Sequence, residues 1–308
     1  MKNSSGKIIV ILGPTSSGKS DVAIKLAKKF GGEVISADSR QVYRHMDIGT
    51  GKIHGTCNMK HKTFISEGIT HYMIDIVSPK TEYNVAKFKK AVDKIIPALL
   101  KRGKLPIICG GTGFWIKAIM DNVQFPAVAP NKELRNKLRN RSAETLFKML
   151  QKLDFERAKN IDKNNKVRLI RAIEIAKVLG YVPKPNFQFP ISNFQFLQIG
   201  IKLPKEKLHK NIKVRLEKRF YQGMIKEVKD LHFKYGVRWK RLESFGLEYH
   251  WIALYLQKKI GLQEMKEKLY QEIKNYARRQ MTWFRKDKRV EWLESYKKIK
   301  EASEKFLK

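Results

Sequence analysis

The sequence predicts an α/β fold with a parallel sheet flanked by helices, interrupted by a mostly α-helical insertion. Short, apolar, β-branched segments alternate with segments of helical periodicity, which is typical of strand–helix–strand crossovers. After residue 124, helical patterns follow one another with no clear strand until about residue 196. The 308-residue chain is 42% hydrophobic, enough for one large domain or two smaller ones.

The first part of the chain supplies most of the predicted core. Residues 7–12 (KIIVIL) form a continuous apolar run that ends at Gly13-Pro14, which indicates a buried strand. The apolar residues between Ser20 and Phe30 have helical spacing, and Gly31-Gly32 ends that helix. The other elements expected in this part are a strand at 33–37, a helix at 87–101 and a strand at 105–109.

The second part begins with the insertion. Its expected helices span residues 133–140, 143–153 and 166–179. A Pro-rich loop, YVPKPNFQFPISNFQF, leads to a strand at 196–203, and the chain is mostly helical from Lys205, with its longest periodic stretch at 264–284. We therefore expect a core formed by residues 1–124 and 196–308 and an insertion domain formed by residues 125–195.

The net charge is the most unusual property of the composition. The chain has 65 Lys and Arg residues against 29 Asp and Glu, which gives +36, and the excess is spread along the whole sequence. A folded chain with this charge repels itself unless it has a polyanionic partner, so nucleic acid is favoured. The alternative is a lysine-biased proteome, since 48 of the bases are Lys and 17 are Arg.

Membrane and disulfide-stabilised classes are disfavoured. No run of about 18 apolar residues is present, and the N-terminal apolar run, Ile8 to Leu12, is too short for a signal peptide. Two cysteines, Cys57 and Cys109, cannot build a disulfide framework or a four-cysteine zinc site. We expect a cytoplasmic protein that has no membrane partner.

A phosphate-binding loop lies between the first strand and the first helix. Its pattern is glycine, four residues, then Gly-Lys-Ser, in the strand-then-helix context that the motif requires. Inward-pointing backbone N–H groups and the helix N-terminus attract phosphate, Lys19 neutralises it, and the Ser20 hydroxyl is a candidate ligand for Mg²⁺. The motif predicts a P-loop NTPase-like core without identifying the phosphate compound. Its residues are Gly13, Pro14, Thr15, Ser16, Ser17, Gly18, Lys19 and Ser20.

Two further segments follow predicted strands. Asp38 comes after the second strand, where a carboxylate can accept a proton or hold Mg²⁺, the alternative being a turn cap. The polar stretch that it begins, with Ser39, Arg40 and Gln41, suits an extended substrate. Gly110-Gly111-Thr112-Gly113 follows another strand and brings the Thr112 hydroxyl toward Asp38.

Basic segments elsewhere are candidates for phosphate contacts. YARRQMTWFRKDKR (276–289) interleaves aromatic and basic residues; we favour phosphate contacts for Arg278 and Arg279 and a core position for Trp283. Arg168 and Arg171 share one face of an insertion helix, which is either a solvated face or an RNA contact.

Six segments in order, GPTSSGKS, DSRQVYR with MDIGTGK, HYMIDI, GGTGFWIKA, KVRLIRAIEI and YARRQMTWFR, together resemble the tRNA dimethylallyltransferase (tRNA isopentenyltransferase) family in its bacterial form. The resemblance runs from about Ile8 to Trp292. It implies transfer of a dimethylallyl group from dimethylallyl diphosphate to the exocyclic amine of the adenosine 3′-adjacent to the anticodon in tRNA. It also implies Mg²⁺ as cofactor, the tRNA anticodon stem-loop as partner and a monomeric enzyme.

The resemblance assigns roles by matched position. Thr15 to Ser20 would bind the diphosphate with Mg²⁺ near Ser20, and Lys19 and Arg215 would stabilise the leaving group. Asp38 would accept the proton or a hydrogen bond of the adenine amine, with Thr112 placing Asp38 and the base. The residues implied in tRNA contact are Asp38, Ser39, Arg40, Gln41, Thr112, Val167, Arg168, Leu169, Ile170 and Arg171, with a further contact loop at 243–248.

Several positions depart from the family pattern. They are His45 in place of glycine, Gly51-Lys52-Ile53 in place of Ala-Lys-Pro, Trp115 in place of tyrosine, Asn211 and Arg219 in place of arginine and methionine, and 244–248, where the pattern has Gly-Tyr followed by a base.

Three other functions share some of these features. A P-loop kinase of a small molecule or nucleoside would have the phosphate loop and Asp38 without needing the basic insertion. An isopentenyltransferase acting on free adenine nucleotides would need neither the insertion nor the high charge. A non-catalytic RNA-binding protein would have no reason to keep Lys19, Asp38 and Thr112 together.

Overall fold

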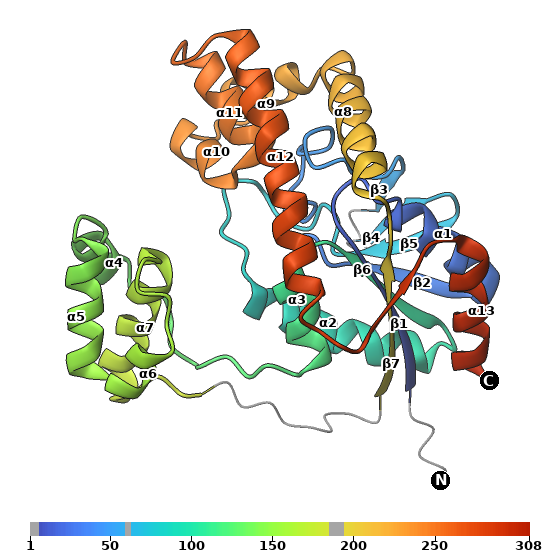
Figure 1. Cartoon of the computed structure of the whole chain (residues 1–308), viewed down its shortest axis with the longest axis horizontal. Coiled ribbons are helices and arrows are strands. Elements are labelled where there is room, and N and C mark those ends of the chain that lie inside the picture. The colour runs from blue at the N-terminus through green and yellow to red at the C-terminus, as the bar shows by residue number, and fades with distance from the viewer. Residues whose placement is uncertain (1–5, 59–62, 185–193) are drawn as a thin grey trace. The chain divides into compact units, whose positions relative to one another are not determined.

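The computed structural model describes residues 6–58, 63–184 and 194–308, and the chain divides into two compact units (Figure 1). Unit 1 comprises residues 1–121 and 190–308, and unit 2 comprises residues 122–189. Most of the Pro-rich loop expected before the strand at 196 lies outside the described residues. Within the described ranges, no helix is both long enough and apolar enough to cross a membrane.

Unit 1 is built on a sheet whose strand order, over the described residues, is β3-β4-β5-β2-β6-β1-β7-β8. Neighbouring strands from β5 to β8 are parallel, while β3 and β4 add an antiparallel edge. The four strands expected from the sequence are β1, β2, β6 and β7, which confirms the α/β class. The bounds are β1 Gly6–Leu12, β2 Gly32–Ser36, β3 Thr56–Asn58, β4 Thr63–Ser66, β5 Ile69–Tyr72, β6 Leu105–Gly110, β7 Phe194–Ile201 and β8 Val290–Leu293.

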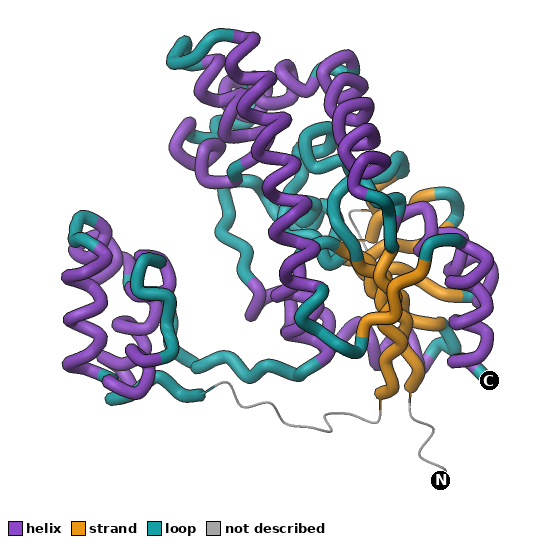
Figure 2. Tube along the Cα trace, viewed as in Figure 1, coloured by secondary structure: helices purple, strands orange, loops and turns teal. Residues whose placement is uncertain are grey.

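Helices cover both faces of this sheet (Figure 2). Side chains alternate along β1, so Ile9 and Ile11 face α1 (Lys19–Phe30) and α13 (Tyr296–Leu307), while Ile8 and Val10 face the other layer. That second layer contains α2 (Val85–Lys101) and α3 (Gly113–Met120). β1 is buried on both faces, which explains its unbroken apolar sequence.

Five helices after β7 extend the second layer and share its core. Figure 1 shows α12 running the length of this helical group down to α3. Their bounds are α8 Lys205–Tyr221, α9 Met224–Phe233, α10 Trp239–Phe245, α11 Leu247–Leu256 and α12 Leu262–Phe284.

Unit 2 is a small helical bundle with a core of its own. Each of its helices begins at a residue whose side chain caps the first turn: Asn131, Ser142, Asp154 and Asn165. Its core includes Leu146, Leu150, Leu169, Ile170 and Ile173. The helices are α4 Lys132–Arg139, α5 Ala143–Leu153, α6 Phe155–Lys159 and α7 Lys166–Leu179.

Candidate active site

The phosphate-binding loop joins the end of β1 to the start of α1, at Lys19. Ser16 and Gly18 have φ angles of 61° and 83°, so the backbone turns through left-handed conformations before the helix. The Lys19 ammonium donates to the Pro14 carbonyl at 2.9 Å and lines the cavity beside the loop. Burial of the Lys19 ammonium lowers its pKa below the ordinary value.

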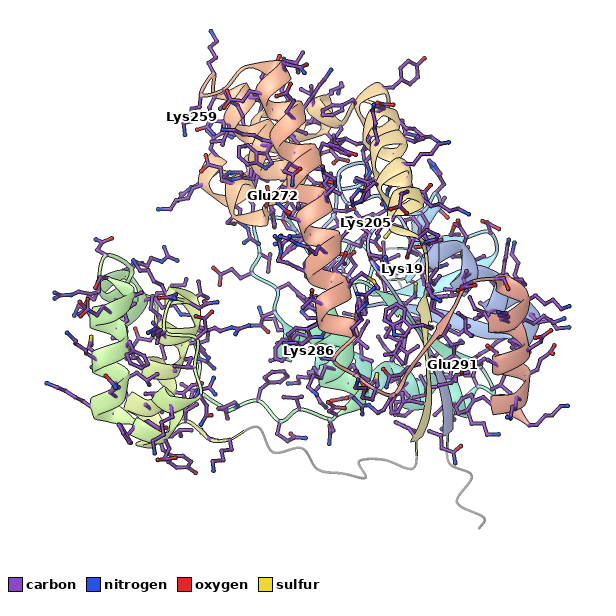
Figure 3. All side chains as sticks on the ribbon, viewed as in Figure 1. Lys19, Lys205, Lys259, Glu272, Lys286 and Glu291 are labelled. Carbon is purple, nitrogen blue, oxygen red and sulfur yellow. The ribbon has the colours of Figure 1, made fainter. Side chains whose placement is uncertain are left out.

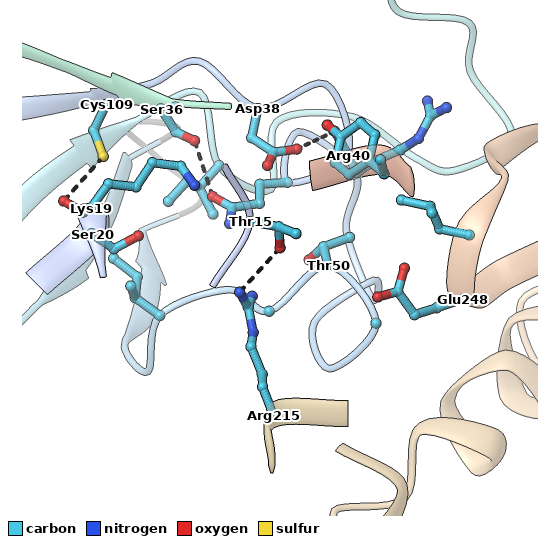
Figure 4. A pocket seen from close by; sticks show the side chains of 18 of the residues that line it. Thr15, Lys19, Ser20, Ser36, Asp38, Arg40, Thr50, Cys109, Arg215 and Glu248 are labelled. Carbon is cyan, nitrogen blue, oxygen red and sulfur yellow. Dashed lines mark hydrogen bonds between the residues drawn. The ribbon is translucent and has the colours of Figure 1, made fainter. Parts of the chain in front are cut away.

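Asp38 and Thr112 lie near this loop because β6 is the neighbour of β1 in the sheet and β2 is the neighbour of β6. The Thr112 hydroxyl accepts a hydrogen bond from the Ser39 N–H at 3.1 Å, and Asp38 Oδ1 accepts one from the Arg40 N–H at 2.8 Å. Both bonds fix the segment in which Asp38 faces the cavity (Figure 4). Gln41 is held separately, since the Ser36 hydroxyl donates to its Oε1 at 3.0 Å.

The Gly-Gly-Thr-Gly turn is the surface on which α12 packs. A Cβ on Gly111 would lie 2.4 Å from Gln280 Nε2, and one on Gly113 would lie 2.1 Å from Trp283. Gln280 is buried; its Oε1 accepts from the Thr15 N–H at 2.8 Å and its Nε2 donates to the Gly111 carbonyl at 2.9 Å. One side chain thus connects the phosphate loop to the turn that carries Thr112.

The core position expected for Trp283 is wrong. Its side chain is 39% exposed and meets Phe114 edge to face, with ring centroids 6.4 Å apart, whereas the adjacent Phe284 is buried. The helix turns by about 100° per residue, so the Trp283 side chain points about a quarter to a third of a turn away from that of Phe284.

Arg215 reaches the phosphate loop from α8. Its Nη1 donates to the hydroxyls of Thr15 at 3.4 Å and Ser16 at 3.5 Å, and Asn211 on the same helix donates to the Ser16 carbonyl at 3.3 Å. Burial, together with the charge of Arg219, lowers the pKa of Arg215 to about 10. These contacts bring together the cations that the resemblance assigned to the diphosphate.

Two cavities adjoin the loop. The inner one has a volume of about 110 Å³ and contains Asp38, Arg40, Tyr276 and Glu248, and the outer one has a volume of about 1350 Å³. The outer cavity is lined by three lysines of α8, which are Lys207, Lys210 and Lys218. The residues that line both cavities are Lys19, Ser20, Gly51, Ile53, Arg215 and Arg219.

The residues expected to contact RNA outside the inner cavity and its turn fall into two groups. Arg278 and Arg279 are exposed on α12, and Lys286, labelled in Figure 3, is exposed just after the end of that helix. In unit 2, Val167 and Arg168 are exposed at the start of α7.

Three insertion residues are engaged within unit 2. Leu169 and Ile170 are buried in its core, so the exposed side chains of the segment expected to contact tRNA are those of its neighbours. Arg171 donates to the Val128 carbonyl at 2.8 Å and pairs with Glu174 at 3.2 Å, which ties its side chain to the fold of the unit.

A sequence profile of the IPP transferase family matches residues 41–287, and an isopentenyl transferase profile matches residues 6–71. The chain belongs to the IPP transferase family. Among the family's curated members, it is 39% identical to tRNA dimethylallyltransferase 1 of Syntrophus aciditrophicus, over 98% of this chain and 97% of the relative. It is 40% identical to tRNA dimethylallyltransferase of Acetivibrio thermocellus, over 93% and 91% of the two chains.

Solved structures agree with this assignment. The chain is similar to the tRNA isopentenylpyrophosphate transferase of Bacillus halodurans, with a TM-score of 0.69 and 31% identity over 98% of this chain and 94% of that one. It is also similar to a eukaryotic dimethylallyltransferase acting on tRNA, with a TM-score of 0.71 and 25% identity over 91% and 70% of the chains. The P-loop NTPase-like core expected from the sequence is confirmed.

Sequence reasoning missed two residues that shape the site. Gln280 is one, although it lies inside the motif YARRQMTWFR. Glu227 is the other: its carboxylate accepts from the N–H groups of Asp47, Ile48 and Gly49 at 2.7, 2.6 and 3.0 Å and from the Tyr249 hydroxyl at 2.8 Å. No local signal in the sequence pairs residue 227 with a loop about 180 positions earlier.

Proposed function

We propose that this protein transfers the dimethylallyl group of dimethylallyl diphosphate to the exocyclic amine of the adenosine 3′-adjacent to the anticodon in tRNA, releasing diphosphate. The observation that carries the proposal is the shared inner cavity. It places cations that suit a diphosphate, Lys19 and Arg215, in the same space as a carboxylate that can accept a proton, Asp38. The names of the curated relatives support the transferred group, dimethylallyl, and tRNA as the acceptor.

The reaction exchanges one bond for another. The bond between the allylic carbon and the diphosphate oxygen breaks, the bond from that carbon to the adenine nitrogen forms, and a proton leaves the amine. Lys19 and Arg215 stabilise the charge that develops on the leaving diphosphate. Asp38 accepts the proton, and the contacts of Ser39 with Thr112 and of Arg40 with Asp38 hold the carboxylate in place.

Magnesium fits this site as a cofactor shared with the substrate. Over the described residues, no group of three or more His, Cys, Asp or Glu side chains could hold a metal ion. The Ser20 hydroxyl lines both cavities, and Mg²⁺ is usually bound by few protein oxygens together with substrate phosphates and water. Ser20 would hold the ion, which would supply additional neutralisation of the diphosphate.

The tRNA is proposed to contact both units. Exposed cations on α12, Arg278 and Arg279, and the exposed Arg168 of α7 would contact its phosphates. Ser39, Arg40 and Gln41 would contact the nucleotide that enters the cavity, since Arg40 and Gln41 line it. A base in the anticodon loop is unpaired, so extruding it costs less than extruding a duplex base. We further propose that the enzyme is monomeric and cytoplasmic.

A side-by-side transfer assay tests this function. Labelled dimethylallyl diphosphate and Mg²⁺ are offered with unmodified tRNA whose anticodon loop is adenosine-rich, or with AMP; labelled ATP is offered in parallel with small-molecule acceptors. Label in tRNA, reduced by about 10²- to 10⁴-fold in Asp38→Asn and unchanged in the surface control Asp93→Asn, supports the proposal. Label in AMP alone would overturn the acceptor, and phosphoryl transfer without prenyl transfer would overturn the reaction.

A further inference from the structure

A buried ion pair stands where the two cavities meet. Arg219 Nη1, from α8, lies 2.7 Å from Glu248 Oε1, from the first turn of α11, and the residues are 7% and 6% exposed. Removing two opposite charges from water costs about as much as their attraction returns, so such a pair is weak evidence for a stabilising role. Its position beside the phosphate loop calls for another explanation.

Arg219 is the neighbour of Arg215. The two are four residues apart on α8 and so share a face of that helix. A Cβ on Gly51 would lie 1.9 Å from Arg215 Nη2 and 2.0 Å from Arg219 Nη2, which shows that both guanidinium groups approach the same point. The Arg219 charge contributes to lowering the pKa of Arg215, after burial.

The charges at this point do not cancel. Within the described part of the chain, Arg219 pairs with Glu248 alone, while Arg215 donates to the neutral hydroxyls of Thr15 and Ser16. Lys19 lines the same junction and donates to a carbonyl. These three cations face the paired Glu248 and the carboxylates Asp38 and Asp21. The excess of positive charge comes from Lys207, Lys210 and Lys218 of α8, which line the outer cavity, and it suits a multiply charged anion.

Three of the departures from the family pattern meet here, at Gly51, Arg219 and Glu248. The absent Cβ of Gly51 leaves the space into which the two guanidinium ends extend. Glu248 already holds the end of the long Arg219 side chain. This side chain would therefore lose less conformational freedom on binding a ligand than an unpaired arginine would.

We propose that Arg219 is an additional ligand for the diphosphate of the donor, positioned by Glu248. The inference rests on the proposed function, since it assigns the donor to the junction of the cavities. Arg219 uses one N–H on Glu248, and its planar group has further N–H donors suited to phosphate oxygens.

Calorimetric binding of inorganic diphosphate to the full chain, without tRNA, tests this role. The double variant Arg219→Met/Glu248→Met removes both charges and leaves the net charge unchanged, and apolar replacement of a buried pair is tolerated by many folds. We expect a loss of diphosphate affinity of about 10- to 100-fold, the size typical of hydrogen bonds to a charged group. The matched control Lys213→Met/Glu217→Met makes the same change on exposed positions of α8 and leaves affinity unchanged.

The inference would be overturned if Arg219→Met/Glu248→Met bound diphosphate within about twofold of wild type while its urea unfolding curve was unchanged. That result would show that Arg219 pairs with Glu248 and does not bind the ligand. Wild-type protein that does not bind diphosphate would overturn it as well. Failure of the proposed function has a different signature: wild type would bind diphosphate and transfer no prenyl group to tRNA.

Discussion

The connection made by Gln280 predicts that one amide side chain supports both the phosphate loop and the turn that carries Thr112. Gln280→Leu keeps the approximate volume but removes the acceptor for the Thr15 N–H and the donor to the Gly111 carbonyl. Leaving a buried polar group without a partner costs about 1–3 kcal/mol. The bond to Gly111 is buried and the bond to Thr15 is partly exposed, so we expect a total loss of about 2–4 kcal/mol.

Urea unfolding and steady-state kinetics measure the two consequences. The free energy of unfolding should fall by the amount above, and the KM for dimethylallyl diphosphate should rise because the loop that holds the donor is no longer fixed. Gln280→Asn, which is one methylene shorter and cannot span both partners, should also raise KM.

Gln271→Leu is the matched control for Gln280→Leu. It lies on the same helix and is exposed, and its amide bonds Asn275 at 3.5 Å. The role of Gln280 is refuted if Gln280→Leu unfolds within about 0.5 kcal/mol of wild type, the usual range for surface changes, and keeps the wild-type KM for the donor.

The site supports three other predictions. We expect protonated Lys19 to bind the anion, so the affinity that Lys19 adds, measured calorimetrically as the ratio of wild type to Lys19→Met at each pH, should be lost as pH rises through a Lys19 pKa that burial holds below 10.5. The ratio removes the effect of protonation of the diphosphate itself; a ratio that does not change with pH would contradict this role of Lys19. Arg278→Gln/Arg279→Gln should weaken tRNA binding. In a filter-binding series, it should also reduce the slope of log affinity against log salt by about 0.7–0.9 for each phosphate that is no longer neutralised. An unchanged slope would count against phosphate contacts by the two arginines. Glu227→Gln places an amide N–H₂ opposite backbone N–H donors, so it should lower the free energy of unfolding, measured in urea, by about 2–4 kcal/mol. The control Glu264→Gln removes a charge from an exposed ion pair and should change that free energy by less than about 0.5 kcal/mol.

Local patterns predicted the elements whose sequence signals are strong. β1 is fully apolar because it is buried on both faces, and the helices at 143–153 and 166–179 have the bounds expected from their caps and periodicity. The edge strands β3, β4 and β5 were not predicted, because each has three or four residues and β3 is largely exposed. β8 was not predicted either, because it has only four residues and follows a basic stretch.

The same distinction applies to the site. The phosphate loop, Asp38 and Thr112 follow strands, and the edge of a parallel sheet brings such residues together, so the sequence order predicted their proximity. Contacts made by long-range packing could not be read in this way, because Glu227 reaches residues 47–49 only through the fold of α9.

His45 shows how a departure from the family pattern is accommodated. Its φ of 64° is in the left-handed region, which explains why glycine suits the position. Its ring stacks on Tyr235, with centroids 4.0 Å apart and planes at 9°. A contact of this kind contributes about 0.5–1.5 kcal/mol, which offsets part of the backbone strain of about 1–3 kcal/mol.

The spacing of residues within YARRQMTWFR determines which side chains of α12 face inward and which are exposed. Tyr276, Gln280 and Phe284 recur every four residues and face inward, respectively to the inner cavity, to the phosphate loop and to the core. Arg278 and Arg279 lie on the exposed side of the same rigid helix. Gln280 bonds both Thr15 and Gly111, and Gly111 precedes Thr112, whose hydroxyl holds the Asp38 segment. One helix therefore positions both the phosphate loop and Asp38.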